Sequence, residues 1–202
     1  TVDSYGSAEL PQREDVLQGA RDIVAEVVAE RADIRGEMRS FYLKSARIVS
    51  KLGRGKEDEG EKFANYYDFS EPLSRIPAHR LLALLRGSQE GVLKVELEAD
   101  DTISKKIVNR FLYNGVKCNT FRLFEQLDMA VEDSIRRLLH PSIENEAIAA
   151  AKEKADLESI RVFGENLRQL LLAAPVGAKR TLAIDPGFRT GCKVVCLGSN
   201  GE

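Results

Sequence analysis

The sequence is poor in the residues that build disulfide frameworks and metal centres. It contains three cysteines (Cys118, Cys192 and Cys196) and two histidines (His79 and His140) in 202 residues. An odd number of cysteines without a Cys-x-x-Cys pair supports neither a disulfide framework nor a zinc site, and the two histidines stand far apart in the chain. We therefore expect no metal site, no cofactor and free thiols that suit a reducing cytoplasm.

Long apolar runs are also lacking. The longest uncharged apolar stretch covers residues 169–177, whereas a membrane-spanning helix needs about 20 residues. No secretory signal is visible, and 43% hydrophobic with 31% charged residues is ordinary for a soluble chain of one to two domains. The chain opens on Thr1 without an initiator methionine, so we expect it to be cut from a longer protein.

The charge is nearly balanced overall but is placed unevenly. A net charge of −2 argues against binding a polyanion through bulk electrostatics. Residues 31–56, however, contain only two acidic residues and eight basic ones: Arg31, Arg35, Arg39, Lys44, Arg47, Lys51, Arg54 and Lys56. These eight are candidate contacts to nucleic-acid phosphates. The alternative is a solvated surface that pairs with the acidic residues at 57–61.

Apolar periodicity predicts a mainly α fold with a minor β element. A first helix is expected from Pro11 to Glu30, with Val16, Ala20, Ile23, Val27 and Val28 facing a core, and a second helix from about Asp33. Short strands are expected at 47–52 and 92–98. A helix follows Pro77, and another, capped by Asp100 or Asp101, runs to Tyr113. The aromatic residues at 63–69 could stack on bases, but a small core is the favoured interpretation.

The second half of the sequence predicts two long helices. The first covers Thr120 to His140, and Pro141 is expected to break it. The second runs from Ser142 to Ala174, and we interpret it as a spine, that is, a long helix that packs against several other parts of the protein. We divide the chain into a helical region at 1–140, a connecting helix at 141–175 and an unfinished domain at 181–202.

The last 22 residues change character and predict a β-hairpin. Apolar segments at 181–185 and 192–197 flank a glycine-containing turn. A lone hairpin is marginally stable in water, so we expect this segment to belong to a sheet with further strands. Asp185 ends the first strand beside the turn and is the one weak catalytic candidate, because a carboxylate there could hold a metal ion or face nucleotide phosphates. No second acid lies on these strands, and a turn-capping role is the alternative.

Five separated blocks of sequence, in a fixed order, resemble the Tex family of transcription accessory proteins. The blocks are Asp68–Arg80, Leu84–Gly87 with Glu90–Leu93, His140–Glu144, Ile160–Arg168 with Leu170–Pro175, and Ile184–Lys193. The resemblance implies a cytoplasmic, nucleic-acid-binding factor built from a helical region, a YqgF-type RNase H-like domain, helix-hairpin-helix units and an OB-fold RNA-binding domain. Residues 181–202 would then be the first hairpin of the RNase H-like domain.

The resemblance leads to one functional expectation and three alternatives. We expect a non-enzymatic helical scaffold within a factor that binds RNA or DNA and works beside the transcription machinery, with its main RNA-binding surface outside this chain. The first alternative is a metal-dependent RNase H-like nuclease that uses Asp185. The second is a module that binds a protein partner. The third is an ATPase of the actin-like fold.

Overall fold

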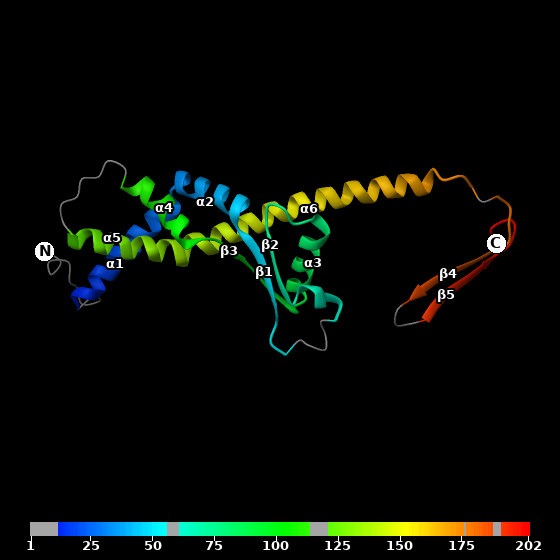
Figure 1. The fold of residues 1–202 in the computed structure, drawn as a ribbon, viewed down its shortest axis with the longest axis horizontal. Helices are drawn as coiled ribbons and strands as arrows, with labels where there is room; N and C mark the ends of the chain where they lie inside the picture. The colour runs from blue at the N-terminus through cyan, green and yellow to red at the C-terminus, as the bar shows by residue number, and fades with distance from the viewer. Residues whose placement is uncertain (1–11, 56–60, 114–120, 176, 188–190) are drawn as a thin grey trace. The chain divides into compact units, whose positions relative to one another are not determined.

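A computed structural model describes residues 12–55, 61–113, 121–175, 177–187 and 191–202 (Figure 1). The chain divides into two compact units, Thr1–Ile160 and Arg161–Glu202, which we call the N-terminal and C-terminal units. The long helix α6, His140–Leu171, begins in the first unit and ends in the second. None of the helices in the described ranges combines the length and hydropathy that crossing a membrane requires.

Helices dominate the N-terminal unit, which confirms the mainly α prediction. They are α1 (Arg13–Glu30), α2 (Ala32–Ser45), α3 (Ala78–Gln89), α4 (Asp101–Leu112) and α5 (Phe121–Asp133), with a 3₁₀ segment at Glu61–Tyr66. The predicted cap of α4 is present, because the Asp100 carboxylate accepts a hydrogen bond of 2.8 Å from the backbone N–H of Thr102. The predicted helix start at Pro11 lies outside the described residues.

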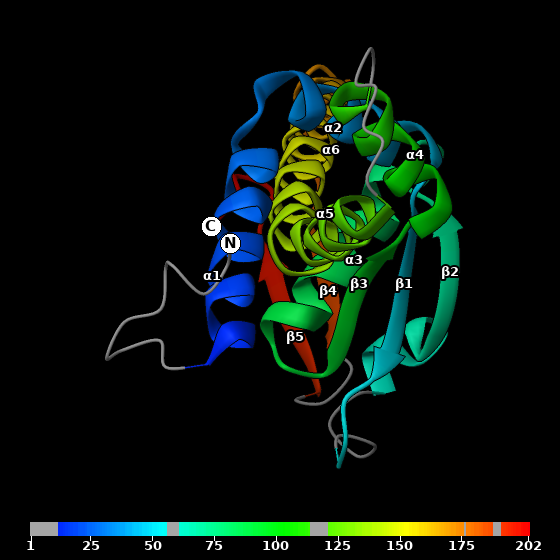
Figure 2. The same ribbon diagram turned by 90° about the vertical axis from the view of Figure 1, so that its left-hand side faces the viewer.

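Helix α1 packs against α5 (Figure 2). The face that it buries differs from the predicted one. Arg21, Ala25 and Val28 are buried, whereas Ile23 and Val27 are 65% and 59% exposed. The prediction that Ile23 and Val27 face the core is therefore wrong. The cause is Arg21, whose guanidinium bonds Glu14 and Gln18 of α1 and reaches Gln126 of α5 at 2.6 Å, so a polar residue occupies the contact face.

Pro141 does not break the helix that precedes it. The helical path runs on through a π-helical segment, Ser134–Leu139, into α6, and the N–H of His140 donates to the carbonyl of Ile135. A proline ring collides with the carbonyl four residues back in a regular α-helix, and it has no N–H to donate. We attribute the wider π turn directly before Pro141 to this conflict. The predicted break is therefore wrong.

A three-stranded antiparallel sheet completes the N-terminal unit. Its strands β1 (Arg47–Leu52), β2 (Asp68–Pro72) and β3 (Leu93–Glu98) lie in the order β2-β1-β3. The predicted strands at 47–52 and 92–98 are confirmed, while β2 was not predicted. One face of the sheet is packed, with Ile48 and Ser50 of β1 fully buried, and α3 lies against it closely enough that a Cβ on Gly87 would meet Leu93 Cδ1 at 2.6 Å.

Side chains bind outward-facing backbone groups on both edges of this sheet. The Glu144 carboxylate of α6 accepts a hydrogen bond of 2.7 Å from the N–H of Leu97, on the outer side of β3. On the outer edge of β2, Pro72 has no N–H, and the Ser70 carbonyl accepts a hydrogen bond of 3.1 Å from the Arg47 guanidinium. An unpaired edge is a template for strand addition, and these contacts occupy part of it.

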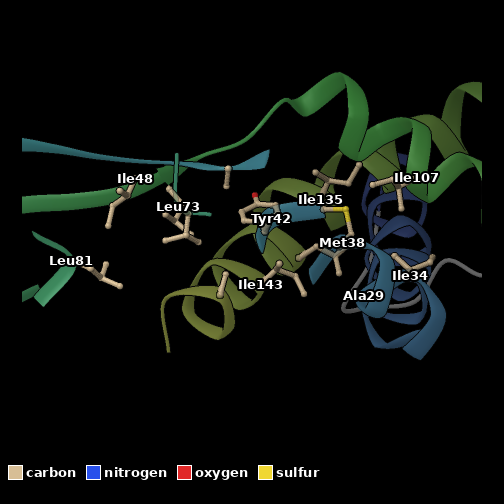
Figure 3. Packing of buried hydrophobic residues seen from close by; sticks show 14 of the residues in the cluster. Ala29, Ile34, Met38, Tyr42, Ile48, Leu73, Leu81, Ile107, Ile135 and Ile143 are labelled. Atoms are coloured by element: carbon tan, nitrogen blue, oxygen red, sulfur yellow. The ribbon is translucent and has the colours of Figure 1, made fainter. Parts of the chain in front are cut away.

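The core of the N-terminal unit joins the helices and the sheet in one continuous cluster (Figure 3). Tyr42 and Met38 of α2 lie against Ile143 of α6 and Ile135 of the π segment, and Ile48 and Leu73 continue the cluster toward α3. Burial raises the pKa of Tyr42 to about 12. Phe63 is buried and Tyr66, Tyr67 and Phe69 pack against the same core, which confirms the favoured interpretation of the aromatic run.

The C-terminal unit contains the last turns of α6 and a two-stranded antiparallel sheet. Strands β4 (Thr181–Gly187) and β5 (Gly191–Leu197) form the predicted hairpin. The side chains of both strands are exposed on both faces. The β4–β5 hairpin therefore lacks the buried face that the sheet of the N-terminal unit has.

Candidate nucleic-acid interface

The described basic candidates lie on two different elements. Lys56 lies outside the described residues. The other seven divide between helix α2 with the residue before it (Arg31, Arg35, Arg39 and Lys44) and strand β1 with the turn after it (Arg47, Lys51 and Arg54). The two groups have different surroundings.

Two arginines of α2 are held by one carboxylate of α6. Arg35 and Arg39 lie one helical turn apart, and both guanidinium groups bond Glu146, with Arg39 at 2.5 and 2.8 Å. Arg35 also donates to Ser142 Oγ at 2.7 Å. Hydrogen bonds from Arg39 and Arg35 lower the pKa of Glu146, so the carboxylate stays charged near neutral pH. These arginines therefore connect α2 to α6 rather than presenting free charge.

Arg31 is also engaged within the N-terminal unit. Its guanidinium pairs with Asp33 at 2.5 Å, donates to the Phe111 carbonyl at 3.2 Å and lies 6.0 Å from the centre of the Phe111 ring. Nearby, Glu37 of α2 pairs with Arg110 of α4 at 2.8 Å. Ion pairs thus join α2 to α4 and to α6, and pairing with the acidic residues at 57–60 lies outside the described residues.

The basic residues of β1 lie on the open face of the sheet. Arg47 and Lys51 alternate with the buried residues Ile48 and Ser50, and both are exposed. Arg47 donates to Ser70 Oγ at 3.0 Å, and it stands opposite Glu98 of β3. Lys44, Lys51 and Arg54 have no ion pair to another described residue. Lys51 and Arg54 are therefore the best remaining candidates for a phosphate contact.

The open face of the sheet does not carry an excess of positive charge. Arg47, Lys51 and Lys94 share it with Asp68, Glu96 and Glu98, and Lys94 pairs with Glu96 at 2.6 Å. A polyanion is attracted by a patch of one sign, and this face is mixed. Any phosphate contact here would therefore be local and weak.

Asp185 lies near the turn end of the hairpin, directly opposite Lys193 of β5. An RNase H-like fold would imply divalent cations at this position, and two-metal chemistry needs several carboxylates around them. The described part of the chain has no group of three histidine, cysteine or acidic residues able to hold a metal ion. The register places Lys193 beside Asp185, and the described parts of β4 and β5 supply no second carboxylate. Arg189, in the turn, lies outside the described residues.

The family of the chain follows from comparison with known proteins. A family model described as Tex central region-like matches residues 2–163. The chain belongs to the Tex family. The Tex match ends at residue 163, close to the end of the N-terminal unit at Ile160.

Individual Tex relatives match almost the whole chain. "Protein tex" of Bordetella pertussis is 39% identical over 205 residues, covering 96% of this chain and 26% of that protein. "Transcriptional accessory protein Tex" of Neisseria gonorrhoeae is 38% identical over 203 residues, covering 98% and 26%. The human "S1 RNA-binding domain-containing protein 1" is 29% identical over 200 residues, covering 94% and 20%. The chain spans about a quarter of the length of the bacterial Tex relatives it matches.

Sequence reasoning missed the acidic partners that decide how the basic residues act. The spacing of Arg35 and Arg39 places them on one helix face, which is a readable signal. Their partner Glu146 is 107 positions from Arg39, and Glu144, which binds the sheet edge, is 47 positions from Leu97. Only the packed fold brings such residues together.

Proposed function

We propose that this chain is the helical scaffold of a Tex-type transcription accessory factor that binds nucleic acid, with RNA as the first ligand to test. The observation that carries the proposal is how the N-terminal unit attaches to α6. Arg35 and Arg39 tie α2 to Glu146, and the sheet is tied to α6 through Glu144 and Leu97. The basic residues of α2 thus serve the internal architecture.

We also propose that the chain is one part of a longer protein. The bacterial Tex relatives are about four times as long, and the human relative is named for an S1 RNA-binding domain. In this proposal β4 and β5 open an RNase H-like domain, the main RNA-binding surface lies elsewhere, and the chain has no enzymatic activity of its own. A cytoplasmic location and contact with the transcription machinery belong to the same proposal.

The proposal is tested by measuring RNA and DNA binding across a range of salt concentrations. Fluorescence anisotropy would compare this chain with a full-length Tex relative. We expect tight, salt-dependent binding by the full-length relative and little or none by this chain, because its open sheet face has no excess charge. Failure of the full-length relative to bind either nucleic acid would contradict the proposal.

A matched pair of variants locates any binding that this chain shows. Lys51→Glu with Arg54→Glu reverses the two candidate contacts. Lys152→Glu with Lys154→Glu makes the same charge change on exposed lysines of α6. Binding with a steep salt dependence that only the first pair abolishes would make the N-terminal unit a nucleic-acid surface and overturn the scaffold assignment.

The rival functions have separate readouts. A nuclease predicts Mg²⁺-dependent cleavage by a full-length protein that is lost in Asp185→Asn. A protein-interaction module predicts that this chain binds a protein partner while a full-length protein fails to bind nucleic acid.

A further inference from the structure

Helix α6 carries apolar side chains on two different faces. In its first half Ile143 and Ala147 are fully buried in the core of the N-terminal unit. In its last turns Phe163, Leu167, Leu170 and Leu171 are 66%, 41%, 75% and 74% exposed. Successive residues of an α-helix are about 100° apart around its axis, so Leu167 and Leu170 lie roughly opposite Ile143 and Ala147. The exposed stripe is therefore not a continuation of the buried face.

The stripe formed by Phe163, Leu167, Leu170 and Leu171 has the pattern of a packing surface. The opposite side of the same turns is mainly polar, with an Arg161–Glu165 ion pair of 2.8 Å and Gln169, and Val162 is its one apolar residue within α6. Gly164 lies within the stripe, and a Cβ built there would meet nothing within 4 Å. An amphipathic helix with a wide apolar side and a glycine in it is suited to close contact with another surface.

The hairpin presents a surface of matching character. Alternation along β4 and β5 places Leu182, Ile184 and Pro186 on one face with Cys192, Val194 and Cys196. Every residue on this face is apolar or a thiol, and Leu182, Ile184 and Val194 are more than half exposed. The other face carries Asp185 and Lys193 together with Ala183, Val195 and Leu197. The first face is therefore free of charge, whereas the second is mixed.

We propose that the apolar face of the β4–β5 hairpin packs on the stripe of α6. Nine residues connect Leu171 to Thr181, and at about 3.3 Å per extended residue they reach roughly 30 Å, enough to fold the hairpin back onto the helix. A short tether gives an effective concentration on the order of millimolar, which favours the hairpin over a second copy.

The two native thiols on the apolar face make the contact measurable by cross-linking. In the complete 202-residue chain with Cys118→Ser, Leu167→Cys places a thiol at the centre of the stripe, and Gln169→Cys places one on the polar side of the same turn. A short bismaleimide should link Leu167→Cys to Cys192 or Cys196 within one molecule, detected by mass spectrometry of tryptic peptides. Gln169→Cys should link at least tenfold less.

Three outcomes would overturn the proposal. They are equal linkage by both variants, no linkage by either, and linkage between molecules that grows with protein concentration, which would assign the stripe to a second copy.

A measurement without any new cysteine gives an independent check. The rates at which Cys192 and Cys196 react with a maleimide reagent report how well their face is covered. Leu167→Glu with Leu170→Glu should raise these rates several-fold, because two charges in the stripe would drive the hairpin off it. Gln169→Glu should leave them unchanged. Rates that are the same in all three proteins would contradict the contact.

Discussion

The two sheets of this molecule differ in how far their faces are buried. The three-stranded sheet of the N-terminal unit has one face buried under α3, and Glu144 of α6 binds the edge of β3. The β4–β5 hairpin has exposed side chains on both faces, and one face is apolar throughout. Antiparallel strands thus have a buried face in the first unit, whereas in the second unit both faces are exposed.

The difference shows that strand sequence alone does not make a sheet stable. Both sheets have alternating strands, but only the first receives side chains from helices distant in the sequence. Two-stranded sheets are marginal in water unless a third strand or a helix covers them.

The largest effect should come from truncating matched isoleucines in the two sheets. Ile48→Ala removes a fully buried side chain of β1, and a cavity of this kind costs about 2 to 5 kcal/mol. Ile184→Ala removes a side chain of β4 that is 57% exposed, and it should leave the unfolding transition of the N-terminal unit within about 0.5 kcal/mol of the wild type. Urea unfolding followed by circular dichroism measures both. Equal losses would show that the two sheets do not differ in packing.

The next effect should come from removing the side-chain contact at the edge of β3. Glu144→Leu removes the acceptor of the Leu97 N–H, and a buried donor left without a partner costs about 1 to 3 kcal/mol. Glu144→Gln keeps an amide oxygen at the same position and should cost less than half as much. Hydrogen exchange should speed up at Leu97 in the leucine variant only. A loss that is as large in Glu144→Gln would point to the charge rather than to the hydrogen bond.

A smaller effect is expected at the carboxylate that joins α2 to α6. Glu146→Gln removes the charge that Arg35 and Arg39 share, and a partly exposed ion pair of this kind is worth about 1 kcal/mol. Since the pKa of Glu146 is lowered in the fold, its contribution is present at neutral pH and is lost as pH falls through that lowered pKa. The difference between the proteins should shrink in high salt and in acid. A difference that persists under both conditions would exclude an electrostatic cause.

Local signals in the sequence were sufficient for much of the fold. The β1 and β3 segments, the Asp100 cap and the pairing of β4 with β5 each have a signature within a few residues, and the structure confirms them. Strand β2 was missed because Asp68 and Pro72 are poor strand formers, and such residues are tolerated because β2 is an edge strand. Its pairing with β1 outweighs its own propensity.

The candidate interface was less predictable than the fold. Eight basic residues in 26 positions indicate a patch, yet the structure places Arg35 and Arg39 against Glu146 and Arg31 against Asp33. Charge density along a chain does not reveal which charges are neutralised by residues far away in sequence. The exposure of Ile23 has the same origin, since Gln126 of α5 binds Arg21 and so selects the buried face of α1.

The smallest effect should be a pH dependence that one histidine adds to the packed region. His140 is half-buried against the Tyr42 ring, 3.4 Å from Ser104 Oγ and 3.8 Å from an Asp101 oxygen, with Glu144 and Arg136 as the other charged neighbours. Burial lowers its pKa in spite of Asp101 and Glu144. The unfolded chain therefore takes up a proton more readily, and stability should fall as pH drops from about 6.5 through the lowered pKa.

Two matched variants isolate this contribution of His140. His140→Phe should flatten the pH dependence of the free energy of unfolding between about pH 7.5 and about pH 5.5, the range around the ordinary histidine pKa. His79→Gln changes an exposed histidine of α3 and should leave the dependence unchanged. If stability instead rose as the pH fell through this range, the folded protein would bind the proton more tightly. The attraction of Asp101 and Glu144 would then outweigh burial, and the packed region would hold a charged imidazolium between α2, α4 and α6.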